Sequence, residues 1–206
     1  MVRAKAQFDD SFLRIHRIDS LYLHARHAIG LPPAELEDLL RSEIVYAVSA
    51  LDRMIHELVK IGMVNIFLGA RPVTMGYTGF QLTLGQHQEV NAPAATGLPP
   101  GEMIFRGIIE QKHSYLSYQD PIKIKEALNY IWDEPYKWQR IAIRMGSSET
   151  VVKQTLSNIV IRRNQIAHEM DLDLATGAIQ NISHADTITS VTFIKNVGQA
   201  IYDLVI

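Results

Sequence analysis

The spacing of apolar side chains predicts a chain built mainly of amphipathic helices. In residues 5–29 and again in residues 34–61, apolar positions recur every three or four residues, as one buried helix face requires. The second segment has the most regular pattern, through Leu36, Leu40, Ile44, Ala47, Leu51, Ile55 and Leu58. Residues 30–33 separate the two helices, and Pro33 suits a first helical turn, where its missing N–H costs nothing.

The segment from residue 69 to residue 101 interrupts this pattern. It holds six of the twelve glycines and four of the eight prolines, and only Arg71 and Glu89 are charged. Because this composition disrupts regular structure, we expect a long loop or a pair of short pieces, inserted into the chain and lying against its body.

Helical spacing resumes in the C-terminal half. We expect helices over residues 102–118 and 122–132, and a short one that follows Pro135 and ends at Ile143. Gly146 and Ser148 are typical of a C-cap and an N-cap, so the next helix is expected over residues 148–169. The last helix is expected from about residues 184–187 to Tyr202, although residues 188–194 are rich in β-branched side chains and also resemble a strand. The pattern predicts an all-α bundle of five to seven helices, forming one domain over residues 1–206.

Composition and charge narrow the class of protein. Apolar residues make up 47% and charged residues 20% of the 206 residues, which is ordinary globular usage. The chain has no cysteine, which excludes disulfides and cysteine–zinc sites. It has neither a signal-like apolar core near the N-terminus nor a run of about 18 apolar residues, so we expect a cytoplasmic protein without membrane contact. A net charge of −2 argues against a protein that coats nucleic acid, so any such activity needs a small local site.

One stretch, residues 161–169, differs from an ordinary helix surface. Arg162 and Arg163 supply donors matched to phosphate oxygens, and His168 can move protons near neutral pH. Together with Asn164, these are the side chains that phosphodiester transfer without a metal would need. The alternative is that both arginines and His168 are surface cations near a helix C-terminus, where the helix dipole favours positive charge.

Helix geometry restricts how these side chains can act together. On a straight helix, Arg163 and His168 are about 140° apart around the axis and about 7.5 Å apart along it, so they cannot converge on one phosphate. Either the helix bends or ends between them, or two subunits share the site across a two-fold axis. Arg163 also falls on the apolar side of the helix and needs a partner, which Asp52 or Glu43 could provide.

The run from Arg163 to His168 fits the Arg-x4–6-His signature of the HEPN superfamily, an all-α group in which a polar residue commonly follows the arginine. Residues 40–52, 131–153 and 162–169, with Asp171 and Asp173, resemble the RiboL-PSP-HEPN branch of that superfamily. The resemblance implies a helical bundle that dimerises so that two motifs face one cleft. It also implies metal-independent endoribonuclease activity, which many members have, often in toxin–antitoxin or phage-defence systems.

The resemblance further implies a role for each residue of the motif. His168 would act as general base or acid on the ribose 2′-hydroxyl or the leaving oxygen, Arg163 would stabilise charge on the phosphorane, and Asn164 would orient His168 or the phosphate. The residues expected to support these or to bind substrate are Arg162, Glu169, Asp52 and Arg41. Two copies of Arg162 and Arg163 would supply the attraction for RNA that the whole chain lacks.

We expect no cofactor and no metal, and as partners an RNA substrate, a second copy of the chain, and an antitoxin or another defence protein. Met170 stands where HEPN toxins paired with nucleotidyltransferase antitoxins have a tyrosine, so silencing by modification there is not expected. Two other interpretations stay open: a non-catalytic HEPN module that binds RNA or protein, and a motif that only stabilises the dimer.

Two further groups of residues suggest sites by their chemistry. His16, His24 and His27 could be metal ligands, but no carboxylate completes a known zinc pattern, and solvated helix histidines are far commoner. Aromatic residues near Pro135 could stack on bases, although such a cluster more often packs the joint between two helices; they are Tyr130, Trp132, Tyr136 and Trp138.

Overall fold

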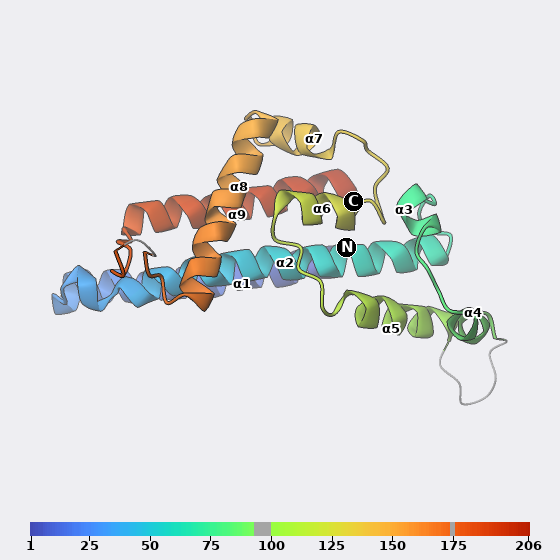
Figure 1. Cartoon of the computed structure of the whole chain (residues 1–206), viewed down its shortest axis with the longest axis horizontal. Coiled ribbons are helices and arrows are strands. Elements are labelled where there is room, and N and C mark those ends of the chain that lie inside the picture. The colour runs from blue at the N-terminus through green and yellow to red at the C-terminus, as the bar shows by residue number, and fades with distance from the viewer. Residues whose placement is uncertain (93–99, 174–175) are drawn as a thin grey trace.

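The computed structural model describes residues 1–92, 100–173 and 176–206, and this part of the chain forms a bundle of nine α-helices without a β-strand (Figure 1). All seven helices predicted from the periodicity are present, so the all-α expectation is confirmed. The helices are α1 (Val2–His24), α2 (Glu37–Phe67), α3 (Met75–Thr78), α4 (Leu84–Asn91), α5 (Gly101–His113), α6 (Pro121–Leu128), α7 (Lys137–Arg144), α8 (Glu149–His168) and α9 (His184–Val205).

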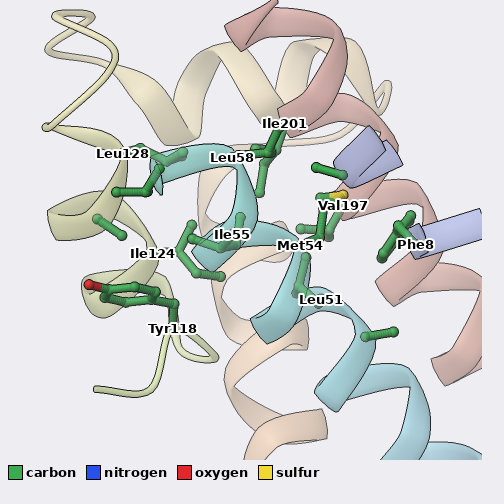
Figure 2. Close-up of a cluster of buried hydrophobic side chains, with 14 of the residues drawn as sticks. Phe8, Leu51, Met54, Ile55, Leu58, Tyr118, Ile124, Leu128, Val197 and Ile201 are labelled. Carbon is green, nitrogen blue, oxygen red and sulfur yellow. The ribbon is translucent and has the colours of Figure 1, made fainter. Parts of the chain in front are cut away.

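Helix α2 is the axis of the bundle. α1, α5, α6, α8 and α9 all pack against it, and Figure 1 shows α1 and α9 running along α2 while α8 crosses steeply over them. The apolar stripe expected in residues 34–61 forms this contact, since Leu51, Ile55 and Leu58 are completely buried. Figure 2 shows these side chains between Phe8 of α1 and Ile201 of α9 on one side and α6 on the other. Its 31 residues make α2 the longest helix of the described chain.

α9 approaches α1 closely at Gly198. A Cβ atom at this position would overlap the ring of Phe8 on α1. Only glycine, which has no side chain, allows α9 to pack this close to α1 here, so a larger residue at position 198 would push the two helices apart.

The helix starts follow the sequence more closely than the helix ends. α2 continues to Phe67, six residues beyond its predicted end, and α5 and α6 end at His113 and Leu128, five and four residues before theirs. α1 continues into one π-helical turn, Ala25–Ile29, which ends at Gly30 in the left-handed region with φ 85°. The Ser148 hydroxyl accepts a hydrogen bond from the backbone N–H of Val151 at the start of α8, as its N-cap position predicts. Ser183 caps α9 in the same way, and the β-branched residues 188–194 are helical. A cap followed by a long buried stripe therefore outweighs their local strand preference.

The segment that follows α2 contains a pair of short pieces, one of the two expected arrangements. α3 is capped by the Thr74 hydroxyl, and α4 begins with a capping box between Thr83 and Gln86. The segment lies against the bundle, as expected, because Arg71 donates to the backbone oxygens of Val205 and Ile131 at 2.8 and 3.1 Å. Predictions for residues 93–99 lie outside the described residues.

No helix within the described ranges is both long enough and apolar enough to cross a membrane.

Candidate functional site

The motif residues lie in the last two turns of α8. The helix continues without interruption from Glu149 to His168 and ends at Glu169, so Arg163 and His168 belong to one regular helix. The alternative that α8 ends between them is therefore excluded. The two side chains remain about 140° apart around the axis of one chain, as calculated for a straight helix.

The chain reverses direction immediately after His168. Met170 and Asp171 both adopt the left-handed region, with φ of 51° and 59°, although neither is a glycine. The N–H groups of Glu169 and Asp171 both donate to the Gln165 oxygen, at 2.9 and 3.0 Å. This arrangement satisfies a carbonyl at the C-terminus of α8 and directs Asp171 back toward the bundle.

Asp171 joins the end of α8 to the start of α2. Its side chain is 1% exposed, and its Oδ2 accepts from Nε of Arg41 at 2.8 Å and from Nη2 of Arg162 at 2.9 Å. A carboxylate buried to this degree is stable only when cations and donors surround it, and here two guanidinium groups do so. The three side chains therefore fix the last turn of α8 relative to α2.

The two arginines of this bridge have further partners. Arg41 is buried and also binds Glu37 at 2.9 Å, Asp38 at 3.3 Å and the backbone oxygen of Gln180 at 2.9 Å. Arg162 also donates to the Gln180 side chain and to the Asn181 oxygen. Both residues thus support the turn that carries His168, and neither guanidinium is held open for a phosphate in this structure.

Arg163 has a different environment. It is half-buried, its Nη1 donates to Oδ1 of the neighbouring Asn164 at 3.0 Å, and its buried Nε lacks a hydrogen-bond partner among the described residues. Within the same residues no carboxylate pairs with it, so the expectation that Asp52 or Glu43 is its partner is wrong. An arginine with an unpaired buried nitrogen has donor capacity left for an anion.

The two expected partners of Arg163 have other environments. Asp52 accepts from the backbone N–H of Tyr118 and from Nε2 of Gln119, so it anchors the chain before α6. Glu43 is completely buried on α2. Asp52 therefore stabilises the packing of the segment before α6 on α2, and within the described part of the chain it forms no hydrogen bond or ion pair with the motif.

The remaining motif residues are open to solvent. Asn164, His168 and Glu169 are all exposed, and the His168 side chain makes no hydrogen bond with any residue that the structure describes. One chain therefore presents His168 without a group that orients its ring. A substrate or a second protein could contact it directly.

A groove of about 660 Å³ runs beside the motif, between the start of α6 and the outer face of α8. Its lining includes Asn164, and apolar Ile122 and Ile161 stand at its edges with 68% and 57% of their surface exposed. Exposed apolar side chains that gather around one groove are typical of a protein contact surface.

The other residues suggested by their chemistry have structural surroundings. Trp138 is buried and donates from Nε1 to the Pro121 oxygen at 2.8 Å, and the Tyr130 ring packs edge-on against Phe80. These contacts favour the packing interpretation of the aromatic cluster. Within the described ranges, no group of three or more histidine or acidic side chains is arranged to hold a metal ion, and His16 lies 3.9 Å from Asp19 only.

Sequence reasoning did not assign a role to Asp171, the residue that organises the end of α8. Its signal is indirect: no glycine follows α8, so another residue must adopt the left-handed conformation, and aspartate tolerates it better than most. Its partners Arg41 and Gln180 lie far from it along the chain, so local patterns cannot identify the bridge.

Comparison with known proteins gives one match that covers nearly the whole chain. No curated protein and no solved structure matches it. The model of the RiboL-PSP-HEPN family matches residues 10–206, a range that includes α8, the bridge to α2 and both flanking helices. The chain therefore belongs to the RiboL-PSP-HEPN family, a branch of the HEPN superfamily.

Proposed function

We propose that this protein is a metal-independent endoribonuclease that acts as a homodimer. The observation that carries the proposal is the Arg163–His168 motif at the end of α8, where His168 is exposed, Arg163 keeps an unpaired donor, and the Asp171 bridge fixes the helix end. Membership of the HEPN superfamily supports a function related to RNA. The reaction, the dimer and a setting in toxin–antitoxin or phage-defence systems are parts of the proposal.

In this mechanism the ribose 2′-hydroxyl attacks the neighbouring phosphorus. His168 removes the hydroxyl proton or protonates the leaving 5′-oxygen, which yields a 2′,3′-cyclic phosphate and a 5′-hydroxyl end. Arg163 stabilises the charge that develops on the phosphorane oxygens. Asn164 accepts a hydrogen bond from Arg163 at 3.0 Å and so positions the guanidinium. A reaction that needs the 2′-hydroxyl is specific for RNA over DNA.

A second copy of the chain would resolve the geometry of the motif. Because one straight helix separates the two side chains by about 140°, a two-fold axis near α8 would bring Arg163 of one chain toward His168 of its partner. The groove beside Asn164, with exposed Ile122 and Ile161, offers an apolar surface for this contact. We therefore place the dimer interface along α8 and the start of α6.

A non-catalytic module that binds RNA or protein is the second candidate. The observation that favours it is the absence, among the described residues, of any hydrogen bond that orients His168. A general base usually has a partner that fixes its ring, and without one the exposed motif would act only in binding.

The test is RNA cleavage in excess EDTA by the purified full chain and by His168→Ala. The wild-type protein should produce 5′-hydroxyl ends, and the variant should be slower by about 10²- to 10⁴-fold, as loss of a general acid or base requires. His27→Ala, which changes another exposed histidine, is the matched control and should leave the rate unchanged. Helical circular dichroism should be the same for all three.

Each other outcome has a defined meaning. Cleavage that persists in His168→Ala contradicts the endoribonuclease, and RNA binding without new 5′-hydroxyl ends supports the non-catalytic module. If Arg163→Ala becomes monomeric on size exclusion and neither protein binds or cleaves RNA, the motif serves only to stabilise the dimer.

A further inference from the structure

A second groove, of about 420 Å³, lies between α1 and α2 and contains none of the motif residues. Its lining combines three arginines with one tyrosine, two serines and an apolar floor, and it includes no acidic residue. The residues are Ser11, Arg14, Ile15, Arg17 and Ile18 of α1 and Tyr46, Ser49, Ala50 and Arg53 of α2. We name it the arginine groove.

The positive charge of the arginine groove is largely uncompensated. Arg17 and Arg53 form no ion pair within the described part of the chain. Arg14 pairs with Asp10 at 2.8 Å, but both side chains are more than half exposed, and such pairs contribute little because water screens them. Three arginines therefore line one groove of a protein whose net charge is −2.

Helix geometry explains why these residues share one groove. Arg14 and Arg17 lie three residues apart on α1, while Tyr46, Ser49 and Arg53 lie about one turn apart on the outer face of α2. Ile15 and Ala50 are buried between the two helices and form the floor. The arginines therefore stand at the two rims of the groove, on helices whose packing fixes the distance between the rims, rather than on a loop.

The chemistry of the lining indicates a ligand with phosphates and flat rings. A guanidinium donates two parallel hydrogen bonds to a phosphate and is always charged. The Tyr46 ring is 55% exposed, which leaves a face on which a nucleic-acid base can stack. The Ser49 hydroxyl adds a neutral donor at the same rim.

We propose that the arginine groove binds the sugar–phosphate backbone of a single-stranded RNA segment, with one base stacked on Tyr46. The inference rests on the proposed function and adds to it the surface that holds the substrate. Of the two arginines in the motif, Arg162 adds little attraction because the Asp171 carboxylate engages it, which leaves Arg163 alone there. The arginine groove supplies the local positive charge that this near-neutral protein needs to attract RNA.

The experiment measures RNA binding by the full chain in a His168→Ala background, so that the RNA stays intact. A fluorescently labelled, unstructured 12-nucleotide RNA is titrated by anisotropy at several salt concentrations. The test variant replaces Arg14, Arg17 and Arg53 with glutamine. The matched control replaces three exposed arginines elsewhere, Arg3, Arg106 and Arg140, which gives the same change in net charge.

The groove variant should bind at least about tenfold more weakly, and the slope of log K against log salt should fall by about 2, since each lost phosphate contact contributes about 0.7 for a single strand. Tyr46→Ala should weaken binding by about tenfold with an unchanged salt slope, because it removes stacking and no charge. The control should stay within about twofold. Lysine at the three groove positions should restore the salt slope and only part of the affinity.

The outcomes separate this inference from the proposed function. Equal weakening by the groove variant and the control overturns the arginine groove, whether or not the wild-type protein cleaves RNA. Selective loss of binding in the groove variant, together with a wild-type protein that produces no 5′-hydroxyl ends, supports the groove and refutes the endoribonuclease. The inference is also overturned if the His168→Ala protein binds no RNA. Where the groove variant loses its helical spectrum, the lysine variant decides: if it folds and binds RNA without recovery of the salt slope, the inference is overturned.

Discussion

Replacement of Glu43 by glutamine is expected to abolish a pH-dependent loss of stability. Glu43 is fully buried in α2, and neither of its carboxylate oxygens has a hydrogen-bond partner in the described part of the chain. Burial, with a smaller contribution from the nearby Asp19 carboxylate, raises the pKa of Glu43 from 4.5 to about 7. At neutral pH the protein therefore carries a buried acid that is partly ionised without compensation.

The sign and size of the effect follow from this pKa. Because the carboxyl binds its proton more tightly in the folded state, the free energy of unfolding falls as pH rises from 4.5 to 7. One pKa unit corresponds to about 1.4 kcal/mol, so the full loss above pH 7 is about 3 kcal/mol. Between pH 5 and pH 8 the loss amounts to about 2.5 kcal/mol.

The assay is urea unfolding of the wild-type protein and Glu43→Gln at pH 5, 6, 7 and 8, at one protein concentration because the proposed dimer would couple to stability. The difference in free energy of unfolding between the two should grow in favour of the variant by about 2.5 kcal/mol across this range. Glu89→Gln, at an exposed position on α4, is the control and should show no such trend. Other titrating groups are common to all three proteins and cancel. A constant difference between Glu43→Gln and the wild type would refute the reasoning.

Three other changes test the bundle and the end of α8. Asp171→Asn should lower the free energy of unfolding by about 3 kcal/mol, because it leaves Arg41 and Arg162 without their shared carboxylate; an unchanged urea midpoint would contradict the bridge. Gly198→Ala should lower the free energy of unfolding by about 1 to 3 kcal/mol, because the new methyl group overlaps Phe8. In a double-mutant cycle, Phe8→Leu in the same chain should recover part of this loss, and additive effects of the two changes would argue against the contact. Burial, with repulsion from His56 and Lys112, lowers the pKa of His113 to about 4, so its neutral form stabilises the fold above pH 6.5 and this stability is lost as pH falls. In the same urea assay, the free energy of unfolding of His113→Phe should rise by about 2 kcal/mol relative to that of the wild type as pH falls from 8 to 5. If the two free energies change in parallel with pH, His113 is excluded as the titrating group.

The long helices could be predicted from the sequence because their stability comes from one continuous buried stripe. Leu40, Leu51 and Leu58 of α2 are at most 1% exposed, as the three- and four-residue spacing requires. Ser148 marked the start of α8 correctly because capping depends only on neighbouring residues. α3 and α4 could not be placed in advance: α3 has only 4 residues, and α4 buries only Val90, so neither shows an apolar stripe.

The surroundings of the motif could be predicted less well than its position. Which carboxylate approaches an arginine depends on how two helices cross. The sequence suggested Asp52 or Glu43 for Arg163, which pairs with no carboxylate among the described residues, and it did not predict the contact of Asp171 with Arg162. That outcome depends on two non-glycine residues in the left-handed region, Met170 and Asp171, which no local rule predicts. The arginine groove was missed for the same reason, because its two rims come from separate helices.

The length of α2 also sets a distance between two parts of the molecule. Its 31 residues span about 46 Å at 1.5 Å per residue. Arg41, near its first turn, holds the end of α8 and His168, whereas Phe67, its last residue, contacts Phe105 of α5, next to α4. The inserted helices and the motif of one chain therefore cannot touch the same nucleotide. An RNA duplex shorter than this span would therefore contact only one end of the α2 axis, whereas an extended single strand could reach from one end to the other.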